Sequence, residues 1–103
     1  MIADDFELIK QIFSNISSNI FEEYDSFGFD VEVGDGYVDY GVVLHKDGAT
    51  IKNAKMEVDE DLLSDLIRRL RANAESRGEP WKSFVLSYKK GEQVKTKFTY
   101  GEK

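Results

Sequence analysis

The sequence predicts an α+β fold in which an antiparallel five-stranded sheet carries two helices on one face, in the order αβββαββ. Two segments, near residues 2–21 and 59–77, place apolar residues three or four positions apart, which is the period of an amphipathic helix. Other segments alternate apolar and polar residues, as half-buried strands do. Glycine-containing turns separate those segments, so we expect hairpins and an antiparallel sheet.

The first element is expected to be a helix whose apolar side belongs to the core. Its predicted buried stripe consists of Ile2, Phe6, Ile9, Phe13, Ile16 and Ile20. Ile12 and Phe21 widen this stripe, and Asp4 or Asp5 is expected to cap the start of the helix.

Three strands are expected next. Residues 27–33 and 38–44 alternate regularly, and Gly34-Asp35-Gly36 between them favours a tight turn. Lys46-Asp47-Gly48 predicts a second turn, followed by a weaker strand over residues 49–55.

The second helix has clear boundaries in the sequence. Asp59 is the expected N-cap, Gly78 is placed for the first residue after the helix, and Pro80 prevents continuation. The predicted buried stripe consists of Leu62, Leu63, Leu66, Ile67, Leu70 and Ala74.

A final hairpin is expected from residues 84–88 and 94–100, joined by a turn over residues 89–92. Trp81, directly after the helix exit, is interpreted as a core side chain that packs the second helix on the sheet. The outward positions are basic: Lys82, Lys89, Lys90, Lys95 and Lys97.

Length and composition exclude several classes of protein. The 103 residues are expected to form one domain, residues 1–103. With no cysteine and one histidine, the sequence has no thiol nucleophile, thiolate metal site or multi-histidine site. The net charge of −6 argues against nucleic acid as a direct ligand, because phosphate binding needs clustered Lys and Arg. Without an apolar span or a secretory signal, we expect a cytoplasmic protein that does not enter a membrane.

No catalytic or cofactor-binding signature is present. His45 has no nucleophile or orienting group nearby in the sequence apart from Asp47. The acidic residues near the first hairpin lack the spacing of a Ca²⁺ loop, and Gly34-Asp35-Gly36 lacks the helix and lysine of a phosphate loop. We therefore expect no enzyme activity, no cofactor and no metal.

Charge is unevenly distributed along the chain. Residues 1–50 carry a net charge of −9, whereas residues 51–103 carry +3. If the alternation buries Phe27 to Val33, then Asp30, Glu32, Asp39 and an exposed aromatic, Tyr37, share the outer sheet face, with Asp35 at the turn. Carboxylates around an aromatic suit a basic protein partner. An ordinary solvated sheet face is the alternative.

The order of motifs resembles the YezG-type immunity proteins. The resemblance is carried by Glu79-Pro80-Trp81-Lys82-Ser83, a Lys-Gly turn, Lys97-Phe98-Thr99-Tyr100, Glu22-Glu23-Tyr24 and Val31-Glu32-Val33. It implies an antitoxin that binds the toxin domain of a polymorphic or contact-dependent growth inhibition system, often a nuclease. Such a toxin is basic where it holds phosphates. We expect the toxin-facing residues to be Asp30, Glu32, Asp35, Tyr37, Asp39 and Asp47.

A second class of protein stays open at this point. The element order, small size and acidity are also similar to type III secretion chaperones, which bind an effector segment as homodimers. That function requires exposed apolar residues on the first helix or the third strand. The sequence does not decide between a monomer and a homodimer.

Overall fold

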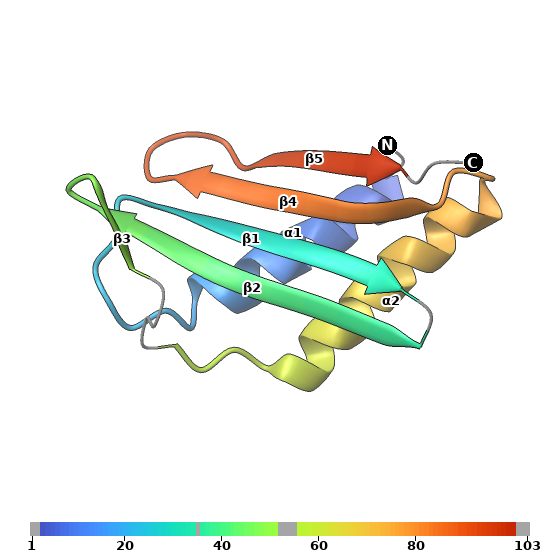
Figure 1. The fold of residues 1–103 in the computed structure, drawn as a ribbon, viewed down its shortest axis with the longest axis horizontal. Helices are drawn as coiled ribbons and strands as arrows, with labels where there is room; N and C mark the ends of the chain where they lie inside the picture. The colour runs from blue at the N-terminus through green and yellow to red at the C-terminus, as the bar shows by residue number, and fades with distance from the viewer. Residues whose placement is uncertain (1–2, 35, 52–55, 101–103) are drawn as a thin grey trace.

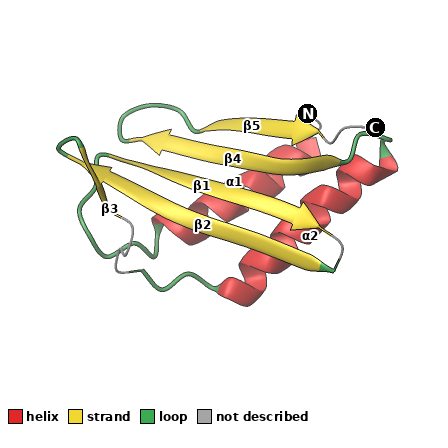
Figure 2. Cartoon of the chain, viewed as in Figure 1, coloured by secondary structure: helices red, strands yellow, loops and turns green. Residues whose placement is uncertain are grey.

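The computed structural model describes residues 3–34, 36–51 and 56–100. The helices of this part are α1 (Ala3–Ser17) and α2 (Glu60–Ser76). Its strands are β1 (Ser26–Gly34), β2 (Tyr37–Lys46), β3 (Ala49–Ile51), β4 (Trp81–Lys89) and β5 (Lys95–Tyr100). They form one antiparallel sheet in the order β3-β2-β1-β4-β5, with both helices on the same face (Figures 1 and 2). The predicted fold class and element order are confirmed.

Residue alternation decides which face of the sheet is buried. Phe27, Phe29 and Val31 of the central strand β1 are at most 2% exposed and belong to the hydrophobic core. Their partners on β2 and β4 are also apolar, so each row of side chains across the sheet adds to the core. These partners are Leu44, Val42, Tyr40, Tyr88, Leu86 and Phe84.

Helix α2 begins and ends at the predicted residues. The carboxylate of Asp59 accepts a hydrogen bond from the Leu62 N–H at 3.1 Å, which makes Asp59 the N-cap. Gly78 follows the helix with φ of +76°, and the Glu79 N–H donates back to the Ala74 carbonyl at 2.9 Å. This hydrogen bond and the left-handed conformation of Gly78 are features of a Schellman motif. The prediction that Leu62 is buried is wrong, because it lies one helical position, about 100°, from the Leu63 side of the stripe.

Helix α1 is shorter than the sequence predicted, and in the described part of the chain its predicted apolar stripe is buried or partly buried except at Phe6. It begins at Ala3, so Asp5 lies within its first turn, and it ends at Ser17. The helix buries Leu8, Ile9, Ile12 and Ile16, whereas Phe6 is 61% exposed.

The chain after α1 is not helical, so Phe21 is not on the helical stripe and is 59% exposed. Ile20 instead forms an isolated bridge with Met56.

Two buried polar residues fix α1 against α2. The Asp5 carboxylate lies 2.8 Å from an Arg77 guanidinium nitrogen and accepts from the Asn73 side-chain amide at 3.2 Å. The Asn15 side chain exchanges two hydrogen bonds with the backbone of Asp59, each 3.1 Å long. Both ends of α2 are therefore tied to α1 by polar contacts within a largely apolar interface.

Trp81 is a core side chain, as predicted. It is 2% exposed and packs edge-on against Phe84, with ring centroids 5.1 Å apart. It also contacts Phe98 on β5, and the Arg71 guanidinium of α2 lies 5.8 Å from its ring centroid. Trp81 therefore joins α2 to the β4–β5 side of the sheet.

Candidate functional site

The outer face of the sheet, opposite the helices, holds three exposed carboxylates close together. Glu32 of β1 lies directly opposite Asp39 of β2, and Asp30 precedes Glu32 by two residues on the same face. A spacing of two residues along a strand is about 7 Å. We call Asp30, Glu32, Asp39 and Tyr37 the acidic patch.

Tyr37 lies at one end of the acidic patch, against Gly34 of β1. It pairs with Gly34 across the β1–β2 turn and is 51% exposed. A side chain at Gly34 would collide with the Tyr37 ring, because the ring lies directly against the glycine backbone. The absence of a Cβ at Gly34 therefore lets the aromatic ring lie along the turn.

The carboxylates of the patch have no cation paired with them in the described part of the chain. Each recorded ion pair lies elsewhere: on the helices, near Lys46 or at the β4–β5 turn. Asp30 has Gly41 on one side and Val85 on the other. Lys97 lies one strand further, about 10 Å from Asp30 across the sheet. Directly opposed like charges without a cation destabilise a sheet.

Val85 is a further surface residue that the sequence interpretation missed. It points to the outer face, is 45% exposed and lies opposite Asp30. The signal was present in Phe84-Val85-Leu86, where three consecutive apolar residues place one of them on the outer face. Val85 extends the acidic patch with apolar surface toward β4.

Asp47 does not join the acidic patch. It lies in the β2–β3 turn with φ of +52°, eight residues from Asp39 and thus about 27 Å along the strand. The remaining member of the predicted set, Asp35, lies outside the described residues.

At the end of the sheet near Asp47, the side chain of Asp25 contacts the β2–β3 turn. Its carboxylate accepts a hydrogen bond from the Asp47 N–H at 2.7 Å and lies 3.8 Å from the Lys46 ammonium. The hydrogen bond from Asp47, followed by the positive charges of Lys46 and Lys90, lowers the pKa of Asp25. The contacts of Asp25 with Asp47 and Lys46 give this carboxylate a structural role, whereas no ion pair is recorded for the carboxylates of the acidic patch in the described part of the chain.

His45 and the acidic residues show no catalytic or metal-binding arrangement in the described segments. His45 is exposed and has one side-chain contact, between its Nδ1 and the Thr50 hydroxyl at 3.4 Å. Residues 3–34, 36–51 and 56–100 contain no group of three or more potential metal ligands. Within the same residues, neither helix is long and apolar enough to cross a membrane.

The resemblance to immunity proteins rests on the order of the residues quoted above. No protein-family model matches this chain, and no curated protein matches it significantly.

Proposed function

We propose that this chain is an immunity protein that binds and neutralises a basic toxin domain, such as a nuclease, through the acidic patch. The observation that carries the proposal is the pair Glu32 and Asp39, which face each other without a cation in the described part of the chain. Such a pair costs stability, and a basic partner would remove that cost. In this proposal the protein acts in the cytoplasm of the producing cell, by binding and without catalysis.

Each part of the patch would have a separate role in binding. The carboxylates would accelerate encounter with a positively charged surface and occupy positions that phosphates take on a nuclease. Tyr37 and Val85, both about half exposed, would contribute the apolar area that is buried at the centre of an interface. Charge would then govern association and register, while the aromatic ring would slow dissociation.

The direct test is protection by coexpression. The C-terminal domain of a large protein encoded immediately upstream would be expressed in a sensitive host, with and without this chain. The proposal expects growth arrest that this chain relieves, and a stoichiometric complex of the two purified proteins. A domain that arrests growth equally in both cultures would refute it.

Neutral variants test the patch itself. The triple variant Asp30→Asn, Glu32→Gln, Asp39→Asn should weaken toxin binding at least about tenfold, mainly through slower association at low salt. Its melting temperature should not fall, because the change removes repulsion. The matched control is Glu7→Gln, Asp65→Asn, Glu75→Gln, which removes three charges from the helix side, where each carboxylate is more than half exposed and pairs with a cation on its own helix. Equal affinity of both triple variants would show that the patch does not bind the toxin.

One observation favours the alternative function, a homodimeric secretion chaperone. Phe6 is exposed on α1 and lines an apolar groove of about 360 Å³ together with Ile9, Phe13 and Val94. A chaperone would be a stable dimer and would bind an effector segment in this groove. Mass measurement in solution and the variant Phe6→Ser distinguish the two functions, because Phe6→Ser should leave toxin binding unchanged and abolish effector binding.

A further inference from the structure

An open pocket lies on the outer face of the sheet, at the end where β1 begins and β4 turns into β5 (Figure 1). It has a volume of about 300 Å³, and every residue that lines it belongs to the described part of the chain. Its hydroxyl, ammonium and imidazole groups come from four different strands. They are Ser26 of β1, His45 of β2, Ser87 and Lys89 of β4, and Lys95 of β5. We call this group, together with Gly28 of β1, the cationic pocket.

The strand register brings these polar side chains together. Ser26 lies opposite Lys89 on one side and opposite His45 on the other. Ser87, two residues before Lys89, lies opposite Lys95. Directly opposed residues are about 5 Å apart and diagonal neighbours such as Ser26 and Ser87 are about 7–8 Å apart. A small ligand placed between the two serines is therefore within reach of both lysine side chains and of the imidazole.

Gly28 leaves the floor of the pocket without a side chain. Glycine inside a strand weakens it, and it commonly marks a bulge, a barrel corner or a place where a ligand approaches the backbone. β1 pairs regularly with both neighbours around Gly28, in an open sheet, so neither a bulge nor a corner is present there. Gly28 does not have a positive φ, and a Cβ at this position would meet no atom of the described residues within 4 Å. Close approach of a ligand is the reason that these observations leave.

The charges and free donors of the pocket favour an anion. Glu92 is the one carboxylate that lines it, and its side chain already lies 3.9 Å from the Lys89 ammonium. In the described part of the chain, Lys95 has no ion pair, and the hydroxyls of Ser26 and Ser87 have no hydrogen-bond partner. A cation beside two hydroxyl donors is the set of groups that holds an anion by charge-assisted hydrogen bonds.

We propose that the cationic pocket binds the phosphate group of a small molecule. A phosphate group has at least three strong acceptor oxygens, so it can accept from donors on several strands at once, whereas a carboxylate has two oxygens in one plane. Lys95 would supply the charge, Ser26 and Ser87 would donate hydrogen bonds, and Gly28 would let one oxygen lie against the strand. The inference goes beyond the proposed function, because it requires no toxin.

The acidic patch restricts the ligand to a compact anion. Asp30 follows Gly28 by two residues on the same face, about 7 Å away, and Glu32 lies two residues further. A nucleic acid that extended along β1 would bring its phosphates onto these carboxylates, and the net charge of −6 opposes such binding. The volume of the pocket is at the lower end of the range for small-molecule sites, about 300–1,000 Å³. A phosphate group with a small attached group fits these limits.

Inorganic phosphate is the first probe, followed by amide NMR shifts of the isotope-labelled protein. Sodium phosphate would replace sodium chloride at constant pH and ionic strength, because salt alone screens surface charges. We expect saturable shifts at Ser26, Gly28 and Ser87. Sodium acetate, which offers a carboxylate in place of a phosphate, should bind at least about fivefold more weakly.

A phosphate monoester distinguishes two sources of the group. Ribose phosphate that binds at least about fivefold more tightly than inorganic phosphate would support the proposal and assign the site to an esterified phosphate. Inorganic phosphate that binds as tightly as ribose phosphate would support it and assign the site to the free ion. A single-stranded oligonucleotide that binds more tightly than both, with an affinity that falls steeply with salt, would overturn the assignment to a small molecule.

Two pairs of variants locate the contact on the protein. Lys95 and Lys97 both lie on the outer face of β5, but only Lys95 lines the pocket. Phosphate affinity should fall at least about fivefold in Lys95→Gln and less than about twofold in Lys97→Gln. Gly28→Val fills the floor of the pocket and should abolish binding, whereas Gly41→Val adds the same side chain outside the pocket on the same face and should not. The lysine pair keeps the test valid if Gly28→Val does not fold.

Two results would overturn the inference, and both differ from failure of the proposed function. The absence of saturable shifts at Ser26, Gly28 and Ser87 with either phosphate probe refutes a phosphate site. Equal losses in Lys95→Gln and Lys97→Gln would show an adventitious attraction to surface charge only. Because the protein is tested alone, either result leaves the proposed toxin binding unaffected, and failure to protect against a toxin leaves phosphate binding unaffected. The triple variant that neutralises the acidic patch should bind phosphate at least as tightly as the wild type, since it removes nearby negative charge.

Discussion

Because Glu32 and Asp39 face each other across β1 and β2, we expect the substitution Glu32→Lys to stabilise the protein and to weaken the proposed binding of a toxin. In Glu32→Lys, the repulsion across β1 and β2 becomes an attraction to Asp39, and Asp30 lies about 7 Å away on the same face. Cross-strand charge pairs are worth about 0.2–1 kcal/mol each. Removing one unfavourable pair and adding a favourable one should raise the free energy of unfolding by about 0.5–1 kcal/mol.

Urea unfolding measures this gain directly. For a domain of this size, we expect the melting temperature to rise by about 3–6 °C and the urea midpoint to rise with no change in m. Glu32→Gln, which removes the repulsion alone, should give about half the effect. At about 1 M salt the gain should largely disappear, because the screening length falls to about 3 Å.

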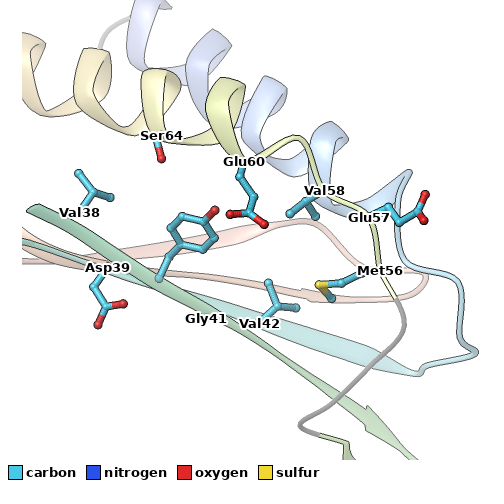
Figure 3. Close-up of a pocket in the computed structure, with 10 residues that line it drawn as sticks. Val38, Asp39, Gly41, Val42, Met56, Glu57, Val58, Glu60 and Ser64 are labelled. Carbon is cyan, nitrogen blue, oxygen red and sulfur yellow. The ribbon is translucent and has the colours of Figure 1, made fainter.

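A matched control separates the local pair from the overall charge. Glu57→Lys makes the same change in net charge at an exposed residue whose side chain points away from β2 (Figure 3). It should give less than half the gain of Glu32→Lys. Equal gains from both variants, or a lower midpoint in Glu32→Lys, would refute the reasoning from cross-strand repulsion.

Three further predictions concern residues outside the patch. Asp5→Asn should lower the free energy of unfolding by about 1.5–3 kcal/mol, because the buried carboxylate loses its 2.8 Å ion pair with Arg77; an unchanged urea midpoint would contradict this. The lowered pKa of Asp25 means that its stabilising effect is complete above about pH 3.9 and is lost as pH falls through the lowered pKa. The stability difference between the wild type and Asp25→Asn should therefore shrink on acidification, and a constant difference from pH 6 to 2 would count against it. Burial, and then Tyr88, raises the pKa of Tyr24, so stability should fall above about pH 10, and Tyr24→Phe should reduce that fall in alkaline urea titrations.

The strands and α2 were predictable because their signals are local. In β1, alternation of Phe27, Phe29 and Val31 with polar residues reflects two faces in different surroundings, and it also placed Asp30 and Glu32 outward. At α2, Asp59 and Gly78 mark backbone positions that few other residues satisfy. These features depend on neighbours within a few residues.

The limits of the buried side of α1 were less predictable. Ile9, Ile12 and Ile16 are buried as predicted, but packing against α2 buries Leu8 and leaves Phe6 exposed. The buried polar residues Asp5 and Asn15 have partners 68 and 44 residues away, so no local pattern marks them. Two aromatic residues that looked like core, Phe6 and Phe21, are therefore exposed.

The third strand could be compared with the structure only in part. The sequence predicted a strand over residues 49–55, and the first three of these residues form β3, Ala49–Ile51. Residues 52–55 lie outside the described part of the chain.

The strand order also has a consequence for synthesis of the chain. β1 pairs on one side with β2, which follows at once, and on the other with β4, which is complete 55 residues after β1 ends. At about 5–20 residues per second, a nascent chain waits about 3–11 s with one side of β1 unpaired. During that time Asp30 and Glu32 would discourage neighbouring nascent chains from pairing there. The charges proposed to attract a partner to the finished protein would therefore also prevent aggregation while the protein is being made.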